Sequence, residues 1–252
     1  MARRLGRRKR PKREKYAERE QLVIEEGVFD TRTMLRLRKL FTHRIIERLI
    51  FLVGKGKEAD TYVAEAGKEA GCNLVAVKIF RIETSSFESR KGYMIGDPRF
   101  SRIKLSMYSI VNEWCKKEFG NLKIAQAAGI HAPRPLIFSG NVLAMEFIED
   151  NGAAAQMLKN TVVERPEEVI DAIIDDIKKL YEHNLVHADV SEYNVLMKGG
   201  VPYLIDFGQA VVIKHPNAAN FLARDIRIIT GYFDRKYGVK RDPEEVFKRI
   251  TG

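Results

Sequence analysis

The stretch Leu185–Gln209, with the sequence LVHADVSEYNVLMKGGVPYLIDFGQ, constrains this chain more than any other segment. It places Asp189 five residues before Asn194, and Asp206 twelve residues after that asparagine. The apolar run Val201–Ile205 ends directly at Asp206, as expected for a strand that carries a polar side chain at its tip. An Asp-Phe-Gly triplet also occurs at ordinary turns, so the interpretation depends on the joint occurrence of these residues.

These residue types suit the transfer of a phosphoryl group from ATP. Such a transfer needs a carboxylate to orient the attacking hydroxyl and oxygen ligands to hold Mg²⁺ on the phosphates. We predict that Asp189 is the catalytic carboxylate and that Asn194 and Asp206 are metal ligands, Asp206 being catalytic as well. The order is that of the protein-kinase catalytic loop, His-Arg-Asp with Asn at the same spacing and Asp-Phe-Gly downstream. Here Ala188 replaces the arginine.

His187 fits two roles in the same loop. It could act as a general base, or it could brace the loop without touching a substrate. Because it lies two residues before Asp189, the brace is favoured and Asp189 remains the predicted base.

The other parts of a nucleotide site precede this segment. Gly54 and Gly56 fit the first two positions of a glycine-rich turn that lets backbone amides approach phosphates, with Ala59 at the third. Lys78, at the end of an Ala-Val-Lys strand, matches the lysine that pairs with phosphates and with a helix glutamate. Taken alone Lys78 could be a surface lysine, but its place between the turn and the catalytic segment favours a catalytic role.

The partner glutamate of Lys78 is predicted to be Glu118 or Glu113. Glu118 is favoured because Leu122 and Gly129 follow it at distances suited to a helix that packs beneath the sheet and then ends. Adenine recognition is expected where the chain leaves the last strand of the sheet, through backbone groups and an apolar pocket. The predicted nucleotide-binding residues are Gly54, Lys55, Gly56, Lys57, Glu58, Ala59, Val63, Ala76, Lys78, Glu118, Met145, Glu146, Phe147 and Ile148.

The composition indicates a protein with a real core. With 252 residues, 45% of them hydrophobic, the chain can fold as one two-lobed domain or two small ones. Cys72 and Cys115 lack metal-ligand spacing and are too few for a disulfide framework, which indicates a reducing compartment. No apolar run is long enough for a membrane span or a secretory signal. The sequence therefore predicts a soluble, cytoplasmic protein without a membrane partner.

Positive charge is concentrated at the N-terminus. The net charge is 44 − 34 = +10, and the first thirteen residues contain eight basic side chains. Such a block can neutralise nucleic-acid phosphates, although it could also be a solvated terminus. Further basic residues favour an RNA or ribonucleoprotein partner. These residues are Arg32, Arg36, Arg38, Lys39, Arg44 and Arg48.

Periodicity predicts an α+β fold with an antiparallel sheet in the first half and mainly helices in the second. We expect strands at 45–53, 73–80, 136–138 and 141–147, and a long loop over 81–100. Helices are expected after Asp30 or Thr31 and at 105–128, 154–158, 166–182, 220–237 and 243–250. The predicted organisation is a basic extension (1–25), an N-terminal helix with an N-lobe (26–148) and a C-lobe (149–252), with a hinge near residues 146–151.

Several segments together resemble the RIO-type atypical protein kinases, and among them the archaeal members of the first RIO subfamily. They are GKGKEADTYVA, VAVKIF, MIGDPRF, KKEFGNLKIA, VHADVSEYNVL, LIDFGQAV and FLARDIR. The resemblance covers about residue 30 to the C-terminus. It implies a trimmed, bilobal protein-kinase-like fold with ATP and Mg²⁺, Mn²⁺ being an alternative. It also implies serine autophosphorylation or ATPase activity and a role in maturation of the small ribosomal subunit, agreeing with an rRNA contact of the basic N-terminus.

Two departures from ordinary protein kinases bear on the mechanism. Ala188 cannot hold a phosphorylated activation loop, and a helical pattern resumes within about a dozen residues of Gly208, which leaves no segment for docking a peptide. The chain could then hydrolyse ATP as a release switch, with Asp206 itself accepting phosphate. For autophosphorylation, the candidate acceptors are the serines of the long loop, which could equally be plain polar residues. They are Ser85, Ser86 and Ser89.

Two other functions fit part of the pattern. Small-molecule kinases of the aminoglycoside or choline type share the catalytic order, but the short chain after Gly208 leaves little room for their substrate pocket. A non-catalytic assembly factor could use the nucleotide site as structure only. The complete set of Lys78, Asp189, Asn194 and Asp206 argues against that, since a degenerate site does not need every ligand.

Overall fold

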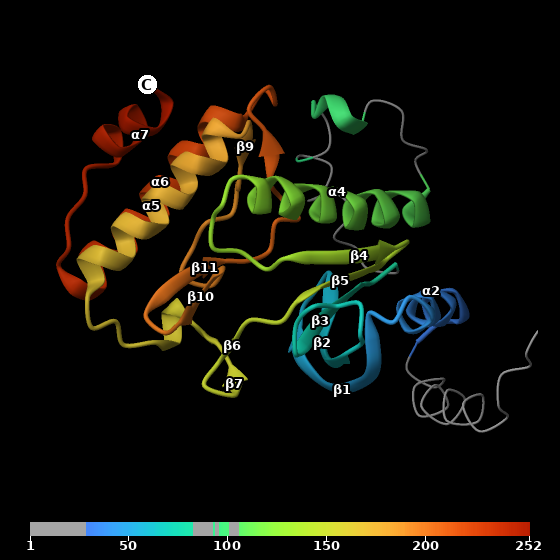
Figure 1. Cartoon of the computed structure of the whole chain (residues 1–252). Helices are drawn as coiled ribbons and strands as arrows, with labels where there is room; N and C mark the ends of the chain where they lie inside the picture. The colour runs from blue at the N-terminus through green and yellow to red at the C-terminus, as the bar shows by residue number, and fades with distance from the viewer. Residues whose placement is uncertain (1–28, 83–92, 94–95, 101–105) are drawn as a thin grey trace, which may run out of the picture.

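The structure is a computed structural model that describes residues 29–82, 93, 96–100 and 106–252 (Figure 1). The predicted basic extension and the candidate serines Ser85, Ser86 and Ser89 lie outside the described residues. The predicted N-terminal helix, the sheet and the helical second half are all within them.

The first half of the chain builds a five-stranded antiparallel sheet in the order β1-β2-β3-β5-β4. The strands are β1 (Ile46–Lys55), β2 (Ala59–Ala66), β3 (Leu74–Phe80), β4 (Pro135–Ser139) and β5 (Val142–Glu146). The glycine-containing turn connects β1 to β2. This arrangement confirms the predicted antiparallel N-terminal lobe.

Two helices pack on this sheet, and strand alternation determines which residues meet each one. Helix α2 (Thr31–Thr42) begins at Asp30, whose carboxylate accepts hydrogen bonds from the backbone amides of Arg32 and Thr33 at 2.9 and 3.1 Å. Odd-numbered residues of β3, such as Val77, share a core cluster with α2. Helix α4 (Met107–Ala127) contacts β4 and β5 and shares the other cluster with Phe80, an even-numbered residue of β3 (Figure 1). Lys78 is therefore on the α4 side of the sheet.

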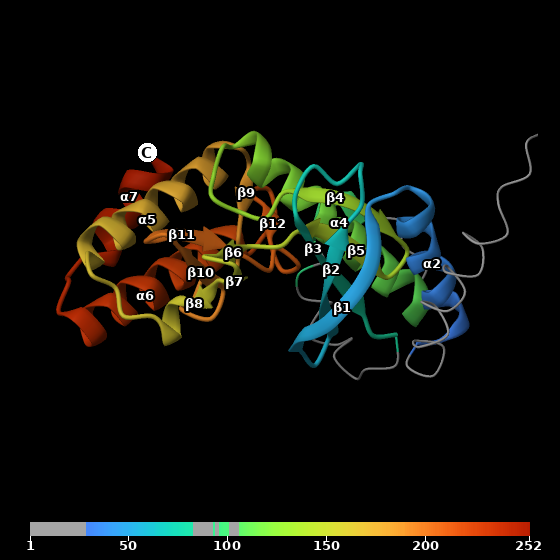
Figure 2. The same cartoon turned by 60° about the horizontal axis from the view of Figure 1, so that its bottom comes forward.

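The second half is mainly helical in the described part of the chain, and its short strands form one three-stranded sheet and two strand pairs that lie between the helices and the five-stranded sheet (Figures 1 and 2). Its helices are α5 (Pro166–Glu182), α6 (Ala218–Tyr237) and α7 (Pro243–Thr251). The short strands are β6 (Glu149–Asp150), β7 (Ala153–Ala154), β8 (Gln156–Met157), β9 (Leu185–Val186), β10 (Val195–Lys198), β11 (Val201–Leu204) and β12 (Val211–Val212). Two 3-10 helices, η1 (Pro98–Phe100) and η2 (Leu158–Asn160), complete the described elements.

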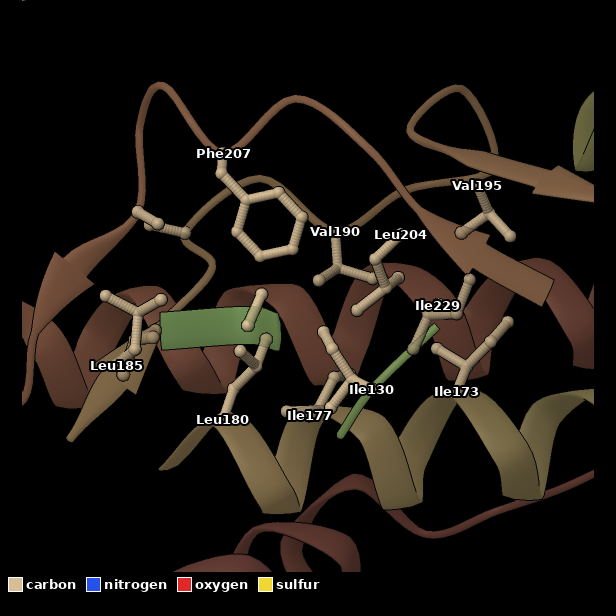
Figure 3. Close-up of a cluster of buried hydrophobic side chains, with 14 of the residues drawn as sticks. Ile130, Ile173, Ile177, Leu180, Leu185, Val190, Val195, Leu204, Phe207 and Ile229 are labelled. Carbon is tan, nitrogen blue, oxygen red and sulfur yellow. The ribbon is translucent and has the colours of Figure 1, made fainter. Parts of the chain in front are cut away.

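The core of the second half lies between α5, α6 and the segments that carry the catalytic motif. Figure 3 shows Ile173, Ile177 and Leu180 of α5 facing Phe207, whose ring points into the cluster. Phe207 is completely buried. The triplet that follows β11 is thus anchored in the core through its middle residue.

The prediction of a helix at 154–158 is wrong. Gln156 and Met157 instead form β8 and pair with Met197 and Leu196 of β10. The local run of Ala, Gln, Met and Leu has good helix propensity, but propensity is a weak preference that tertiary pairing overrides. The other helices and strands to which the sequence assigns ranges lie within a few residues of those ranges, whereas β6, β7, β9, β10 and β12 were not predicted. No helix within the described ranges is long and apolar enough to cross a membrane.

Ile173 offers a test of this core. Its side chain is fully buried in the cluster of Figure 3, so we expect Ile173→Ala to lower the free energy of unfolding by about 2–5 kcal/mol. Val162→Ala is the control, because Val162 is 85% exposed and its truncation should change stability by no more than about 0.5 kcal/mol. Urea unfolding followed by circular dichroism measures both. Equal effects of the two substitutions would contradict this packing.

Candidate active site

An ion pair between the sheet and α4 forms the buried end of the site. The Nζ atom of Lys78, on β3, donates to Oε1 and Oε2 of Glu118 at 2.9 and 3.0 Å. The Lys78 side chain is 12% exposed and that of Glu118 is 1% exposed. Glu113 is instead paired with Lys116 on the helix surface. Of the two glutamates that the sequence proposes, the structure therefore brings Glu118 to Lys78.

Asp206 completes a three-residue network around the same ammonium group. Its Oδ1 accepts a hydrogen bond from Lys78 Nζ at 3.0 Å, and its side chain is 46% exposed. Burial disfavours the charge of Lys78, but the carboxylates of Asp206 and Glu118 outweigh it and raise the pKa of Lys78. Burial raises the pKa of Glu118, which Lys78 opposes. For Asp206 the pairing with Lys78 outweighs the effect of desolvation and lowers the pKa of the carboxyl group. The carboxylate is therefore ionised, and its exposed part is available to a ligand.

The backbone at Asp206 adopts a left-handed conformation, with φ of 63°. Aspartate tolerates this region better than most residues, but the conformation still needs support from its surroundings. Helix α4 lies close to the same turn, because a Cβ on Gly208 would lie 2.9 Å from Trp114 Nε1 and 3.2 Å from Glu118 Oε2. The glycine of the triplet is thus required by the close approach of α4.

Asp189 and Asn194 form the second half of the site. Asn194 Nδ2 donates to the backbone oxygen of Asp189 at 2.8 Å and to its Oδ2 at 2.9 Å. The amide oxygen of Asn194 is therefore the atom left to bind a cation. Burial, followed by the negative charge of Asp206, raises the pKa of Asp189 to about 6, although the hydrogen bond from Asn194 opposes the shift.

His187 lies beneath this loop and is only 2% exposed. Its Nε2 lies 3.1 Å from the carbonyl oxygen of Ile205, and its ring packs edge-on against Phe207 with a centroid distance of 4.7 Å. Burial lowers its pKa to about 4, so the ring is neutral and Nε2 is the donor to Ile205. These contacts are those of the brace that the sequence favours, linking the catalytic loop to the segment that carries Asp206.

Two residues that lie against the loop of Asp189 are not among those predicted from the sequence. Arg224 of α6 donates to the carbonyl oxygen of Ala188, the residue that stands in place of the usual arginine. The side chain of the neighbouring Asp225 is 1% exposed, and burial raises its pKa to about 8. The only signal in the sequence is periodicity, which places Asp225 on the buried side of α6 where an apolar residue is expected.

The remaining predicted residues lie on the sheet and where the chain leaves it. The backbone amide of Gly56 donates to the carbonyl oxygen of Ala59 at 2.9 Å. A Cβ on Gly56 would lie 2.8 Å from the same oxygen, so glycine is required there. Val63 and Ala76 are direct neighbours across β2 and β3. The flanking turn residues are Gly54, Lys55, Lys57 and Glu58. Met145 and Glu146 end β5, and Phe147 and Ile148 follow.

The negative charge of Glu58, in the turn, makes a small contribution to the raised pKa of Asp189. The side-chain oxygens of Asn194 and Asp206 are of the kind that suits Mg²⁺, which binds one or two protein side chains together with phosphates and water. Within the described ranges, no group of three or more His, Cys, Asp and Glu residues could hold a metal ion.

Comparison with known proteins agrees with this geometry. The model of the RIO domain family matches residues 60–246. A RIO-type serine/threonine-protein kinase Rio1 from Haloferax volcanii is 37% identical over 233 residues, which are 92% of this chain and 79% of that protein. The chain belongs to the RIO-type serine/threonine-protein kinases. A Rio1 protein from Thermoplasma acidophilum, 41% identical over 181 residues (72% of this chain and 95% of that one), supports placement in the Rio1 subfamily.

Solved structures support the fold of this RIO kinase. The Rio2 kinase from Chaetomium thermophilum aligns with a TM-score of 0.68 at 24% identity, covering 86% of this chain and 67% of that one. A second structure of that protein, described as an ADP/Mg²⁺-phosphoaspartate complex, has a TM-score of 0.67 at 23% identity, covering 87% and 66%. These likenesses confirm the predicted kinase-like fold.

The partnership of Glu118 with Lys78 can be tested in this RIO kinase without an activity assay. Because Glu118→Gln removes the buried anion beside Lys78, we expect a loss of about 1–3 kcal/mol in the free energy of unfolding. Glu113→Gln is the matched control on the same helix, and its exposed pair with Lys116 should contribute no more than about 0.5 kcal/mol. Thermal and urea unfolding of both variants decide the matter. A larger loss for Glu113→Gln would contradict the observed pairing.

Proposed function

We propose that this RIO kinase is an ATP- and Mg²⁺-dependent enzyme that phosphorylates itself on serine and hydrolyses ATP during maturation of the small ribosomal subunit. The observation that carries the proposal is the network of Lys78, Glu118 and Asp206, assembled from β3, α4 and the end of β11, with the Asp189–Asn194 pair beside it. A phosphoryl-transfer enzyme needs these four kinds of group, namely a phosphate-binding cation, its anchor, oxygen ligands for a metal and a base.

Each side chain then has a distinct role. Lys78, held by Glu118, binds the phosphates, and the half-exposed carboxylate of Asp206 shares Mg²⁺ with Asn194, Mn²⁺ being an alternative ion. Asp189 orients the acceptor hydroxyl and takes up its proton. The nucleotide is held by the glycine turn, by the neighbouring side chains of Val63 and Ala76, and by the backbone of residues 145–148.

Asp206 could serve as the acceptor itself in an ATPase cycle. Its carboxylate oxygen would attack the γ-phosphorus, the bond to the bridging oxygen of ADP would break, and water would later hydrolyse the acyl phosphate. The proposal is supported by the exposure of this carboxylate and by the phosphoaspartate named for the Chaetomium thermophilum Rio2 structure. An acyl phosphate is labile to hydroxylamine whereas phosphoserine is not, so phosphate trapped after ATP addition that resists hydroxylamine would count against this route.

A contact with ribosomal RNA is the partner proposed for the basic N-terminal region. The described part of this region includes α2, where Arg32, Arg38 and Lys39 are exposed, and no acidic residue occurs within Thr31–Thr42. Such a face binds phosphates by releasing counterions, so its affinity for RNA should fall with added salt. A cytoplasmic location is part of this proposal, in keeping with the two free thiols Cys72 and Cys115.

Phosphate transfer tests the function directly. We expect Lys78→Ala and Asp189→Ala to abolish incorporation of labelled γ-phosphate and release of inorganic phosphate, because each removes a group used at the reacting atoms. Arg249→Ala is the control. It removes only an exposed ion pair with Asp175 and no predicted site residue, so it should keep full activity. Mass spectrometry after incubation with Mg²⁺ and ATP locates the acceptor. Retained activity in either variant, or transfer to a small aminoalcohol but never to protein, would contradict the proposal.

The pH dependence follows from Asp189. Its pKa of about 6 means that below pH 6 the carboxyl group is protonated and cannot accept the proton of the hydroxyl. We therefore expect kcat/KM, which reports the free enzyme, to rise as pH rises through 6 and to be about tenfold lower at pH 5 than at pH 7. Initial rates at saturating Mg²⁺ between pH 5 and 8 measure this. A flat profile between pH 5 and 7 would exclude Asp189 as the base.

A further inference from the structure

Helix α4 carries a second pair of buried polar side chains beside Glu118. Lys117 is 2% exposed and Asn121, one turn later, is fully buried. Burial, reinforced by the charge of Arg99, lowers the pKa of Lys117 to about 7. An apolar residue would avoid this desolvation, so polar groups at these positions call for a specific use.

Both side chains bind the backbone just after Asp206. Lys117 Nζ donates to the carbonyl oxygen of Gly208 at 2.7 Å. Asn121 Nδ2 donates to the carbonyl oxygens of Phe207 at 2.8 Å and Ala210 at 3.0 Å. Two adjacent turns of one helix thus engage three carbonyl groups in a stretch of four residues. We call this set of contacts, with Arg99, the carbonyl clamp.

Arg99 orients the amide of Asn121. Its Nη1 donates to Asn121 Oδ1 at 2.8 Å, which turns the amide nitrogen toward the two carbonyl groups. Arg99 is itself held by Asp97, a 2% exposed residue, through contacts of 3.0 Å from Nε to Oδ1 and 2.7 Å from Nη2 to Oδ2. A guanidinium fork on a carboxylate is a rigid arrangement. Arg99 and the backbone of residues 207–210 therefore bind to neighbouring side chains of α4.

The clamp acts on a backbone that needs restraint. Asp206 has a left-handed φ of 63°, and such conformations persist only when the surroundings determine them. Phe207 anchors one side in the core, as Figure 3 shows. The clamp restrains the carbonyl groups on the following side. Because Glu118 lies between Lys117 and Asn121 on the same helix, α4 sets the position of Lys78 and of the Asp206 backbone together.

We propose that Lys117 and Asn121 are positioning residues for Asp206, with Arg99 orienting Asn121. None of the three touches the substrate in this arrangement. Their effect passes through the backbone of residues 207–210 to the carboxylate that faces Lys78. The proposal rests on the function proposed for Asp206 above.

The first test needs no catalysis. Asn121→Asp keeps the shape of the side chain but replaces its amide donor by an acceptor, and Lys117→Met removes the ammonium while keeping the stem. Hydrogen exchange of the nucleotide-free protein, read by mass spectrometry, should be about tenfold or more faster in peptides covering residues 206–210, with peptides of α5 unchanged. Lys117→Arg should restore protection in part. Lys116→Met, which alters an exposed neighbour, is the control and should leave exchange as in the wild type.

The second test uses metal dependence. Groups that orient a metal ligand typically change metal affinity by about 10–100-fold when removed. We therefore expect Asn121→Asp to raise the Mg²⁺ concentration for half-maximal activity by at least about tenfold and to lower kcat, while KM for ATP at saturating Mg²⁺ changes by less than about threefold. The single tryptophan, Trp114, whose ring lies 4.8 Å from Lys117 Nζ, reports any change in the same place by fluorescence.

The outcomes separate the two proposals. If wild-type protein shows no phosphate transfer, the function proposed for the site fails, and exchange alone still decides whether the clamp holds residues 206–210. Faster exchange throughout the molecule in the clamp variants would show general loss of stability and overturn the positioning role. Wild-type exchange in both Asn121→Asp and Lys117→Met, together with wild-type Mg²⁺ dependence in Asn121→Asp, would overturn it as well.

Discussion

The ammonium group of Lys78, held between Glu118 and Asp206, is the interaction on which the rest of this structure depends. One carboxylate comes from a helix packed on the sheet and the other from the end of a strand in the second half of the chain. Because a buried lysine is tolerated only with partners of opposite charge, the sheet, α4 and the β11 end must meet at one point. The elements around this point are arranged accordingly, with β3 presenting Lys78 on its α4 side.

The network is asymmetric, and the asymmetry is what suits it to bind a ligand. Glu118 is sealed at the inner end, while Asp206 leaves nearly half of its side chain exposed at the outer end. The inner carboxylate fixes the position of the lysine, and the outer one offers charged oxygens to an incoming cation. The negative charge of Asp206 also helps to raise the pKa of Asp189, which accepts a hydrogen bond from Asn194.

Sequence reasoning found the residues whose spacing along the chain encodes their role. Asp189, Asn194 and Asp206 were predicted because a loop and a strand end have strict local spacing, and Lys78 because it follows a glycine turn. Lys117, Asn121 and Arg224, whose partners lie far away along the chain, were not predicted. Asn121 meets Phe207 and Lys117 meets Gly208 across 86 and 91 positions, and Arg224 reaches Ala188 from another helix. Nothing local distinguishes these from solvated lysines, asparagines and arginines.

The fold was predictable to a similar extent and for a similar reason. Strand alternation and helix periodicity gave the elements of both lobes, and Asp30 marked the start of α2. The prediction of a helix at 154–158 was wrong because this segment pairs with β10, which lies about forty residues later in the chain. Local patterns therefore specify which elements form, while the contacts between them decide the exceptions.

In the function proposed above, Asp206, held by Lys78, binds the metal that accompanies the nucleotide. Thermal unfolding with ATP, in the presence of Mg²⁺ or of EDTA, tests it most directly, since a ligand that binds the folded state raises its stability. In the wild-type protein we expect ATP with Mg²⁺ to raise the unfolding temperature more than ATP with EDTA does. In Asp206→Asn that difference should vanish while the effect of ATP alone remains. A Mg²⁺-dependent increase of the same size in Asp206→Asn would contradict metal binding by Asp206.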